Sequence, residues 1–460
     1  MFIGRKKEME KLNQLYASGK FEFAVVYGRR RIGKTTLITE FCKEKKAVYY
    51  MASESTGKEN LENFSRAVFE VTAPGFDMPA FQSFDALFRY IGQHLQERLI
   101  LVIDEYPYLA ESDRSVSSVL QAYIDQYWKE TPLMLILCGS SMSFMEYQVL
   151  GYKSPLYGRR TAQFRLQPFT FAETTQFLPG YNKEDQAVIF GVTGGIPEYL
   201  SRILPERSLD DNMIDLFFSA SGRLFEEPSN LLKQELKNFA IYNAVIGAVA
   251  KGRSRLNEIA TTVGEETSSC SNQLNALISL GLIKKEVPST ESPTSRKTIY
   301  RLKDNMFLFW YRFVSPNISN IERGLGEQVY RHKVKPQISD FMGSVFEKIC
   351  IQYLYREDVI GKAPFFYGNL GRWWGTDPRS RTQAEIDIVG TEGDSILLGE
   401  CKWRKEKTDT AVLEKLVGYG DMFPQKDRWY YLFSKSGFDE NVLGKAEKDP
   451  HIRLIEFKDM

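Results

Sequence analysis

The sequence predicts an α/β protein of several domains, and three observations lead to that prediction. The chain has 460 residues, which is too long for one hydrophobic core and enough for roughly two to four domains. Before residue 170, apolar runs that can form buried strands alternate with helical stretches. After residue 338, further strand-like runs follow a stretch of short helices.

Composition excludes several classes of protein. The apolar fraction of 43% and the charged fraction of 26% are ordinary for globular proteins, so disordered, coiled-coil and fibrous classes do not fit. No run approaches the roughly 18 apolar residues that span a bilayer, and the start MFIGRKKEMEKL lacks the apolar stretch of a signal peptide. We therefore expect a cytoplasmic protein without a membrane partner. The net charge of +1 leaves nucleic-acid binding open.

Cysteine and histidine usage restricts the possible metal sites. Five cysteines are scattered without a CxxC pair, and the chain has only three histidines. A disulfide framework, a zinc site and a Ser-His-Asp triad are all poorly supplied by these residues. We expect any bound metal ion to be held by oxygen ligands.

A phosphate-binding loop follows the first strand-like run. The residues FEFAVVYG, which end at Gly28, are apolar enough for a strand buried on both faces, and GRRRIGKTTLITEF follows. In the spacing G-x-x-x-x-G-K-T, Gly28 and Gly33 let the backbone turn tightly and present N–H groups to phosphates. Lys34 would reach the β and γ phosphates of ATP, and the Thr35 hydroxyl would hold Mg²⁺. The residues predicted to bind the nucleotide here are Gly28, Arg29, Arg30, Arg31, Ile32, Gly33, Lys34, Thr35 and Thr36.

Four more strand-like runs leave room for helices between them and predict a right-handed, mostly parallel sheet. These runs are Ala47 to Ala52, Leu99 to Ile103, Leu133 to Cys138 and Ala162 to Leu166. The run LILVIDEY contains Asp104 and Glu105 near its end. At the carboxyl end of a strand beside the phosphate loop, Asp104 would anchor Mg²⁺ and Glu105 would polarise the attacking water. On its own, such a pair more often marks a strand exit without a ligand.

Two further groups could contact the γ phosphate. The strand LMLILCGSS ends on Ser140 and Ser141, whose hydroxyls could sense that phosphate. Arg159 and Arg160 follow a turn and could act as arginine fingers, in the same subunit or in a neighbouring one. Paired arginines are also common as solvated surface residues, and a finger that acts on a neighbour would require a homo-oligomer.

Five motifs, in this order, resemble one family. FIGRKKEMEKL, GRRRIGKTT, VIDEY, the GSS strand end and TGGIPEYL look like the archaeal-type ATPases of the AAA+ and STAND neighbourhood, over about Met1 to Leu232. The resemblance implies that Gly4 and Arg5 lie near the adenine. It also implies that Gly195 and Pro197 belong to a helical lid over the nucleotide. A helix break alone would explain the same glycine and proline.

The middle of the chain resembles a winged helix-turn-helix. Three short helical stretches, starting at Phe239, precede a polar turn and RKTIYRLKD, which predicts a β-hairpin. The third helix of this fold often lies in a DNA major groove. Base contacts could come from Ser268, Ser269, Ser271, Asn272 and Gln273, and phosphate contacts from Lys251, Arg253, Arg255, Arg296, Lys297 and Arg301. Because the third helix has no Arg or Lys before Lys284, an interdomain scaffold is an equal alternative. The aromatic run NMFLFWYRFV that follows is expected to pack between domains.

The last segment resembles the core of the PD-(D/E)XK nucleases. SDFMGSVFEKICIQYLY predicts an amphipathic helix, and strands are expected at PFFYGNL, AEIDIVG, SILLGECKW, RWYYLFS and HIRLIEF. The helix TAVLEKLVGYG lies between the third and fourth of these runs. This order of elements is similar to that superfamily from about Ile338 to Met460. The proline that often precedes the motif aspartate is replaced here by Glu385 and Ile386, which loosens the match.

The residues of this segment fit a metal-dependent site. Glu400 and Lys402 lie two apart on one strand and point the same way, opposite Asp387 on the preceding strand. Asp387 and Glu400 would bind Mg²⁺ with the Cys401 carbonyl, and Glu347 could complete the ligand set. Lys402 would orient or activate the attacking water. A cross-strand ion pair on an exposed face is the alternative.

We therefore predict four segments along the chain. They are a P-loop ATPase over residues 1–235 with a helical lid from about 170, a winged helix-turn-helix over 236–315, a linker over 316–337, and an α/β restriction-endonuclease-like domain over 338–460. Together they resemble the archaeal-type ATPases with a DEXX box and a C-terminal domain of uncharacterised function. The predicted function is ATP hydrolysis coupled to a Mg²⁺-dependent domain that acts on DNA. The alternative is a regulatory or scaffolding ATPase whose nuclease-like domain is inactive and contacts a partner protein.

Overall fold

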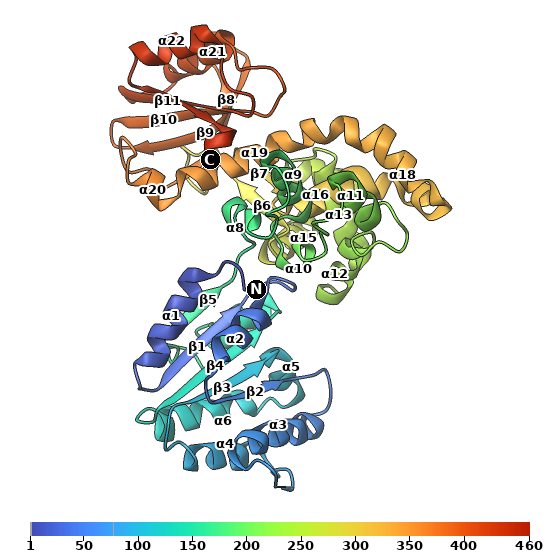
Figure 1. Cartoon of the computed structure of the whole chain (residues 1–460), viewed down its shortest axis with the longest axis vertical. Helices are drawn as coiled ribbons and strands as arrows, with labels where there is room; N and C mark the ends of the chain where they lie inside the picture. Colours follow the sequence, from blue (N-terminus) through green and yellow to red (C-terminus); the bar gives the residue numbers. More distant parts are fainter. Residues whose placement is uncertain (1, 77) are drawn as a thin grey trace. The chain divides into compact units, whose positions relative to one another are not determined.

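The computed structural model describes residues 2–76 and 78–460 of the chain. These residues form two compact units (Figure 1). The first unit contains residues 1–168 and 196–198, and the second contains 169–195 and 199–460. The polypeptide therefore passes between the units at three places, after residues 168, 195 and 198.

The first unit is built around a parallel sheet of five strands, as the sequence predicts. Its strands are β1 (Glu22–Tyr27), β2 (Ala47–Met51), β3 (Leu99–Asp104), β4 (Leu133–Gly139) and β5 (Ala162–Arg165). They lie in the order β2-β3-β4-β1-β5, and every neighbouring pair is parallel. β3 and β4 are buried at every residue, which is why their sequences are continuous apolar runs. Because parallel strands end at one edge, the loop after β1 and the acids after β3 meet there.

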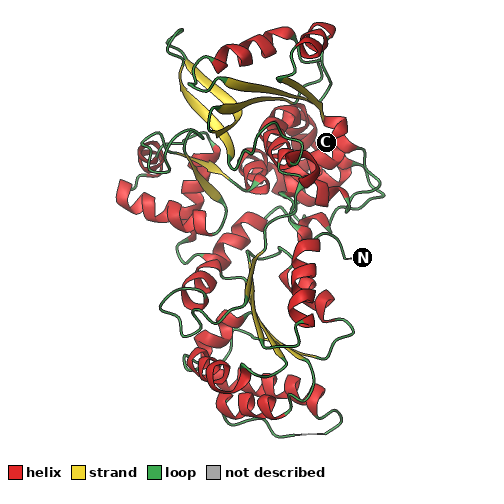
Figure 2. Cartoon of the chain, turned by 90° about the vertical axis from the view of Figure 1, so that its left-hand side faces the viewer, coloured by secondary structure: helices red, strands yellow, loops and turns green. Residues whose placement is uncertain are grey.

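Helices cover both faces of this sheet (Figure 2). They are α1 (Lys6–Ala17), α2 (Lys34–Cys42), α3 (Gly57–Thr72), α4 (Phe84–Gln93), α5 (Tyr106–Ser112), α6 (Val116–Tyr123) with its extension η1 (Ile124–Trp128), and α7 (Met142–Phe144) with its extension η2 (Met145–Val149). α3 and α4 each begin at a hydroxyl side chain, Thr56 and Ser83, which accepts a hydrogen bond from a backbone N–H of the first turn. The start of these helices is thus fixed by local sequence.

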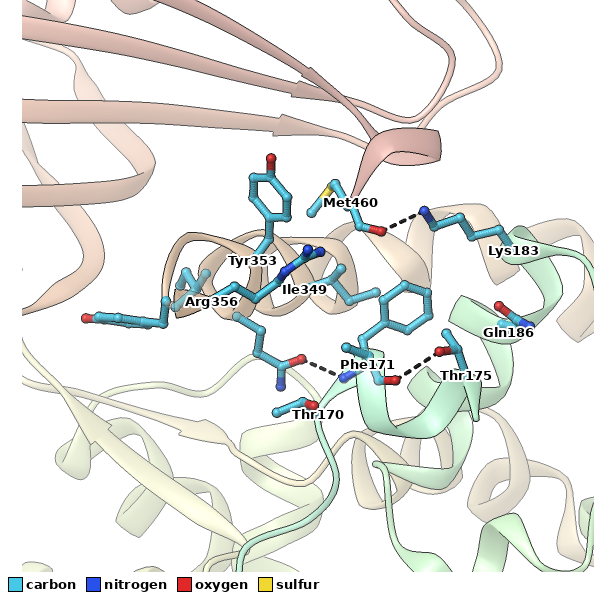
Figure 3. Close-up of a pocket in the computed structure, with 13 residues that line it drawn as sticks. Thr170, Phe171, Thr175, Lys183, Gln186, Ile349, Tyr353, Arg356 and Met460 are labelled. Atoms are coloured by element: carbon cyan, nitrogen blue, oxygen red, sulfur yellow. Dashed lines mark hydrogen bonds between the residues drawn. The ribbon is translucent and has the colours of Figure 1, made fainter. Parts of the chain in front are cut away.

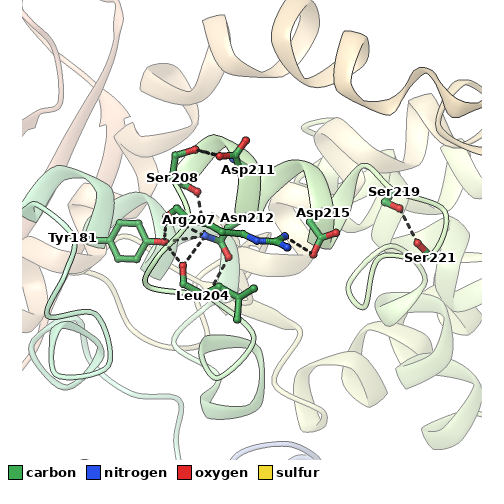
Figure 4. A network of polar contacts seen from close by, with 9 residues as sticks. All are labelled: Tyr181, Leu204, Arg207, Ser208, Asp211, Asn212, Asp215, Ser219 and Ser221. Carbon is green, nitrogen blue, oxygen red and sulfur yellow. Dashed lines mark hydrogen bonds and ion pairs between the residues drawn. The ribbon is translucent and has the colours of Figure 1, made fainter.

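The second unit begins with a group of helices. They are α8 (Phe171–Thr175), α9 (Lys183–Thr193), α11 (Leu209–Phe217) and α12 (Glu227–Glu235), while α10 (Pro197–Leu200) begins in the first unit and ends in the second. Asn212 on α11 is only 2% exposed and fixes the loop before its helix (Figure 4). Its Oδ1 accepts from the Leu204 N–H at 2.8 Å, and its Nδ2 donates to the carbonyls of Leu204 and Ser208 at 3.1 Å each. This buried amide therefore satisfies the Leu204 N–H, a backbone group in the loop before α11.

Three helices and a β-hairpin follow, in the order that the sequence predicts. They are α13 (Phe239–Ala250), α14 (Leu256–Val263), α15 (Thr267–Ser279), β6 (Ile283–Glu286) and β7 (Ile299–Leu302). The two strands are antiparallel, with Lys284 opposite Arg301 and Glu286 opposite Ile299. Partners in a register leave the sheet on the same face, and so do residues two apart. Lys284, Glu286 and Arg301 therefore share one face of the hairpin.

The aromatic run and the segment after it are helical. α16 (Asn305–Phe309) continues into η3 (Trp310–Val314), and the Trp310 indole N–H donates to the Phe225 carbonyl at 2.6 Å inside the second unit. Residues 316–337, which we expected to be a linker, form η4 (Ser315–Asn317), α17 (Ile318–Asn320), η5 (Ile321–Leu325), α18 (Gly326–Val329), η6 (Tyr330–Val334) and η7 (Lys335–Gln337). Four apolar side chains of this segment are buried, which explains why it is ordered as helix: Ile321, Val329, Tyr330 and Val334.

A mixed five-stranded sheet ends the chain. Its elements are α19 (Ile338–Leu354), α20 (Glu357–Ile360), β8 (Leu370–Thr376), β9 (Gln383–Glu392), β10 (Ser395–Lys402), α21 (Thr410–Gly420), β11 (Asp427–Ser434), α22 (Glu440–Lys448), β12 (Ile452–Glu456) and the short turn η8 (Phe457–Asp459). The strand order is β12-β11-β10-β9-β8, with β8, β9 and β10 antiparallel and β10, β11 and β12 parallel.

Two expectations for this sheet were wrong. The first strand was placed at PFFYGNL, but the strand is the next stretch, where Trp373 and Trp374 pair with Ile386 and Glu385 of β9. Helix α22 was missed, although Asp439 before it caps the helix by accepting a hydrogen bond from the Val442 N–H at 2.8 Å.

Among the described residues, no helix is both long and apolar enough to cross a bilayer.

Candidate functional sites

The loop after β1 has the shape of a phosphate cradle. Gly33 has φ 87°, in the left-handed region that favours glycine. A Cβ on Gly28 would lie 2.8 Å from the Leu166 carbonyl oxygen, so no side chain fits there. Lys34 is 6% exposed, and its Nζ donates to the carbonyls of Gly28 at 3.0 Å and Arg29 at 3.3 Å. Its ammonium group is therefore held over the loop, where phosphate oxygens would meet it.

Asp104 is the centre of a hydrogen-bond network at the carboxyl edge of the sheet. It is 1% exposed, and its Oδ2 accepts from the Thr35 hydroxyl at 2.9 Å and the Tyr49 hydroxyl at 2.6 Å. Its Oδ1 accepts from the Glu105 N–H at 2.9 Å. Thr35 and Asp104, which we predicted as two magnesium ligands, are thus adjacent oxygen donors. Hydroxyl and carboxylate oxygens are hard ligands, which Mg²⁺ prefers, so Thr35 and Asp104 fit this ion.

Tyr49 is a member of this network that the sequence did not indicate. It lies on β2 two residues before Met51, which pairs with Asp104 of β3, so Tyr49 and Asp104 lie on the same face of the sheet. Burial and then the charge of Asp104 raise the pKa of the Tyr49 phenol, which therefore remains a hydrogen-bond donor. The only signal was the alternation of AVYYM, which fixes the face of the tyrosine but not its partner.

Glu105 is held in an uncommon backbone conformation next to Asp104. Its φ is 48°, in the left-handed region, which costs about 1–3 kcal/mol for a residue that is not glycine. Its Oε2 accepts from the Ser140 N–H at 3.1 Å and the Ser140 hydroxyl at 2.9 Å. Ser140, predicted as a phosphate sensor, therefore positions the predicted general base in this structure.

The predicted arginine fingers lie in different environments. Arg159 is bound by Asp125, with Nε 3.0 Å and 3.1 Å from the two carboxylate oxygens and Nη2 2.5 Å from one of them. This contact lowers the pKa of the Asp125 carboxyl. Arg160 lies near enough to Tyr27 for its charge to lower the pKa of that phenol, which burial raises overall.

The motifs at the start of the chain and after α9 also lie at the loop. Arg5 is 5% exposed, and its Nη2 donates to the carbonyls of Ile32 at 3.0 Å and Gln167 at 2.6 Å. Its side chain thus fastens the loop, while its contact with adenine stays a prediction. A Cβ on Gly33 would lie 3.7 Å from the Pro197 ring, so Pro197 flanks the same loop. In addition, Arg30 donates to the Tyr108 hydroxyl at 2.9 Å.

A second group of charged side chains lies in the C-terminal sheet. Glu347 is on α19, Asp387 on β9, and Glu400 and Lys402 on β10. The register pairs Ile388 with Gly399, and the Cys401 N–H donates to Asp387 Oδ2 at 2.9 Å. Lys402 Nζ lies 2.5 Å from Glu400 Oε1. We call Glu347, Asp387, Glu400 and Lys402 the acid cluster.

Arg372 joins the acid cluster and was not predicted. It lies on β8, where the register to β9 shifts between Gly371 and Trp373. Its Nε is 3.5 Å from Glu347 Oε2, and its Nη2 is 3.0 Å from Glu385 Oε2. A β-bulge redirects side chains and has no signature in this sequence, which is why Arg372 could not be found from pattern alone.

Burial makes the charges of the acid cluster costly. It raises the pKa of Glu347 to about 8, with a further contribution from the charge of Asp387. Burial also raises the pKa of the Asp387 carboxyl, against the opposing effects of the Cys401 N–H and Lys402. For Glu400, burial and then Asp387 raise the pKa, and Lys402 opposes them. Burial therefore opposes the ionisation of all three carboxyls.

The ligand set for a metal ion in the acid cluster is not preformed. Across residues 2–76 and 78–460, no three His, Cys, Asp or Glu side chains are arranged to hold one. The physical reason is that Glu400 is paired with Lys402 and Glu347 with Arg372, so their oxygens are turned toward cations. The donor chemistry fits Mg²⁺, but Glu400 would have to release Lys402 first.

A cavity of about 650 Å³ lies elsewhere in the second unit (Figure 3). Helices α8, α9 and α19 line it, together with the end of the chain. Lys183 Nζ donates to the Met460 carbonyl at 2.7 Å at one side of it, and the Phe171 N–H donates to Gln352 Oε1 at 2.8 Å. None of the residues that we predicted as functional lines this cavity, so its size does not identify the site of chemistry.

Comparison with known proteins agrees with the geometry of the first unit. Residues 2–203 match a model of an ATPase domain predominantly from Archaea. Residues 310–413 match a family described as archaeal bacterial proteins of unknown function. An uncharacterised protein of Methanocaldococcus jannaschii is 33% identical over 446 residues, which cover 95% of this chain and 96% of that protein. The loop and the parallel sheet thus define a P-loop ATPase fold. The chain belongs to the same family as the Methanocaldococcus jannaschii protein, and its residues 2–203 form an ATPase domain of a kind found predominantly in Archaea.

Two further comparisons concern parts of the chain. An uncharacterised ATP-binding protein of Pyrococcus horikoshii is 26% identical over 237 residues, which cover 44% of this chain and 73% of that protein. The solved structure of a Walker-type ATPase of Pyrococcus abyssi has a TM-score of 0.54 and 19% identity, and the match covers 68% of this chain and 96% of that one. This second likeness is one of fold.

Proposed function

We propose that the chain binds ATP with Mg²⁺ in the loop after β1 and hydrolyses it. The observation that carries the proposal is the network in which Thr35 and Glu105 both bond to Asp104 while Ser140 holds Glu105. It joins the ends of β1, β3 and β4 at one point. Such an arrangement of a hydroxyl, a metal-binding acid and a second acid is what phosphoryl transfer to water needs.

Each residue would have a separate task. Lys34 would neutralise the phosphates, and the backbone N–H groups between Gly28 and Thr35 would surround them. Thr35 and Asp104 would hold Mg²⁺, which when bound offsets the phosphate charge. Glu105 would accept the proton of the attacking water, since its second carboxylate oxygen is not the one that binds Ser140. Arg160 is the proposed arginine finger, from this subunit or from a second copy.

Replacement of Lys34 by Ala tests this proposal. We expect ATP binding to weaken by at least about 100-fold and turnover to disappear, because a buried charge contact with phosphate is lost. Lys43→Ala is a suitable control, since Lys43 is 64% exposed at the end of the same helix and pairs with Glu40. Equal ATP hydrolysis by the Lys34→Ala variant and the wild type would contradict the proposal.

A second candidate function concerns the acid cluster, for which we propose Mg²⁺-dependent cleavage of DNA. The observation that favours it is that three half-buried carboxyls and Lys402 lie on neighbouring elements, with Asp387 bonded to the backbone of β10. Asp387, Glu400 and Glu347 would hold Mg²⁺ after Glu400 separates from Lys402. Lys402 would then be released to orient the attacking water. In the alternative, the ion pairs of Lys402 and Arg372 are permanent, and the domain is an inactive scaffold for a partner protein.

A DNA cleavage assay distinguishes these alternatives. Plasmid, linear and single-stranded DNA would be incubated with Mg²⁺ or Mn²⁺, with and without ATP, using wild type, Asp387→Ala and Lys402→Ala. Glu392→Ala is the matched control, because Glu392 ends the same strand as Asp387 and is exposed. Cleavage that both site variants lose and the control retains would support the nuclease. Absence of cleavage with intact ATPase activity would favour the scaffold.

A further inference from the structure

The charged face of the β6–β7 hairpin lies beside the acid cluster. Backbone contacts fix this position: the Ser289 N–H, in the loop after β6, donates to the Arg372 carbonyl at 2.9 Å. A Cβ on Gly371 would lie 3.3 Å from Ser289 Cβ, so the two segments are packed closely. β8 is the edge strand of its sheet, and its exposed edge therefore receives the loop of the hairpin.

Electrostatics agrees with this placement. The charges of Arg301 and Lys284 lower the pKa of the Glu347 carboxyl, although burial raises it overall, and Arg301 acts in the same direction on Asp387. Glu286, on the same face, raises the pKa of Glu347 and forms an ion pair with Lys284. These side chains are the ones that the register places on one face of the hairpin. That face is therefore the one turned toward the acid cluster.

The distribution of charge argues for a polyanion between the two. A cluster of carboxylates alone would repel the phosphodiester backbone on which we propose it acts. Helix α15 offers no compensation, because its sequence TSSCSNQLNALIS contains no Lys or Arg. The hairpin supplies two cations on this face, Arg301 and Lys284, and β8 supplies Arg372. Among the described residues, Arg301 and Lys284 form no ion pair with the acid cluster, and Lys284 pairs with Glu286.

We propose that the β6–β7 hairpin forms one wall of the site and that Arg301 and Lys284 bind the phosphates of the DNA strand presented to the acid cluster. The inference rests on the proposed DNA-cleaving function and adds the element that binds the substrate. It also assigns the hairpin face to the C-terminal sheet, so that α15 is not required to enter a DNA groove. Arg301 and Lys284 are thus positioning residues for the substrate.

The test is DNA binding by the full chain, measured by fluorescence anisotropy of labelled single-stranded and duplex DNA in EDTA, where no cleavage occurs. We expect Arg301→Ala to weaken binding about tenfold and to reduce the slope of log affinity against log salt by about one, as loss of one phosphate contact requires. Arg301→Lys keeps the charge and is expected to retain the wild-type slope. Lys285→Ala is the control, since Lys285 lies on the same strand but on the other face, and it should bind as wild type.

The outcomes separate this inference from the nuclease proposal. Wild-type affinity and salt slope in both Arg301→Ala and Lys284→Ala would overturn it, and so would absence of DNA binding by the wild type. Faster cleavage by Arg301→Ala would also overturn it, because the hairpin would then be a plug over the acids. DNA binding that depends on Arg301, combined with no cleavage under any condition, would support the proposed role of the hairpin in DNA binding. It would contradict only the nuclease proposal. A melting curve for each variant excludes misfolding as the cause of lost binding.

Discussion

At the scale of single residues, the acids of the two sites differ in the hydrogen bonds that they accept. Asp104 is 1% exposed and receives three hydrogen bonds, which satisfy a buried carboxylate. In the acid cluster, Asp387 accepts a hydrogen bond from the Cys401 N–H, and Glu347 Oε2 lies 3.5 Å from Arg372 Nε, outside hydrogen-bond distance. The first carboxylate is thus stabilised by hydrogen-bond donors, whereas burial raises the pKa values of the three carboxyls in the second site.

Replacement of Glu105 by Gln tests its role as the base. Glutamine keeps the size of the side chain and an oxygen for Ser140, but it cannot take a proton from water. We expect nucleotide affinity to stay within about threefold and turnover to fall by about 100-fold or more, the usual contribution of a general base. ATP hydrolysis and ADP binding would be measured in parallel. Glu111→Gln, on the exposed face of α5, is the control, and normal turnover in Glu105→Gln would remove Glu105 from this role.

The raised pKa of Glu347 predicts how stability changes with pH. Its pKa rises from an ordinary 4.5 to about 8 on folding, so the folded state binds the proton more tightly than the unfolded state. The stability that this proton contributes is complete below the unfolded pKa and is lost as the pH rises through the folded value. We expect the melting temperature of the second unit to fall between about pH 5 and pH 8 and the fall to be smaller in Glu347→Gln.

The control for this pH dependence is Glu392→Gln, an exposed glutamate on β9. Its melting temperature should follow that of the wild type at every pH. A wild-type profile that is flat, or that Glu347→Gln leaves unchanged, would show that Glu347 is ionised in the folded protein. Addition of Mg²⁺ or Mn²⁺ above pH 8 should restore part of the loss if the acid cluster binds a cation.

The roles of single residues could be predicted from the sequence where a motif spacing defines the site. They could not be predicted where only the tertiary structure brings the residue to the site. The phosphate loop and the acids at the end of β3 follow from local sequence, and their positions agree with the structure. Tyr49 and Arg372 join the sites through sheet pairing and a bulge. Asp125, which binds Arg159, is 34 residues away in sequence, so no pattern could have linked the two.

At the scale of elements, packing in the folded protein, and not the apolar periodicity of the sequence, determines where several helices and strands form. The parallel sheet was predictable because β3 and β4 are continuous apolar runs. The first strand of the C-terminal sheet was misplaced because PFFYGNL is as apolar as the true strand, and only the pairing of Trp373 and Trp374 with β9 selects between them. Helicity of 316–337 depends on burial within the second unit, which the sequence does not display.

Two glycines in helices give a matched test of this packing. Gly326 at the start of α18 has φ −64°, which suits alanine, but a Cβ there would lie 1.6 Å from the Phe218 carbonyl oxygen. Gly343 in α19 has nothing within 4 Å of such a Cβ. We expect Gly326→Ala to destabilise the second unit by about 1–3 kcal/mol and Gly343→Ala to stabilise it by up to about 1 kcal/mol. Thermal unfolding would measure both, and equal melting temperatures would mean that α18 moves freely away from Phe218.

At the scale of the whole molecule, the division into two units predicts two unfolding events. ATP with Mg²⁺ binds residues of the first unit under our proposal, so it should stabilise that unit by about 2.7 kcal/mol at 100 times its Kd. We expect calorimetry to show two transitions, of which nucleotide raises one. The Lys34→Ala variant should show the same two transitions without the shift. A single transition that moves as a whole would mean that the units unfold cooperatively.

Residues 196–198 give the nucleotide loop a mechanical connection. They are counted with the first unit, yet the chain belongs to the second unit immediately before and after them. Pro197, in this short piece, flanks Gly33 of the phosphate loop. A displacement of Pro197 is therefore transmitted through the backbone to the residues of the second unit that precede and follow it. Residues 196–198 therefore cannot move with the phosphate loop unless α9 before them and the rest of α10 after them also move or deform.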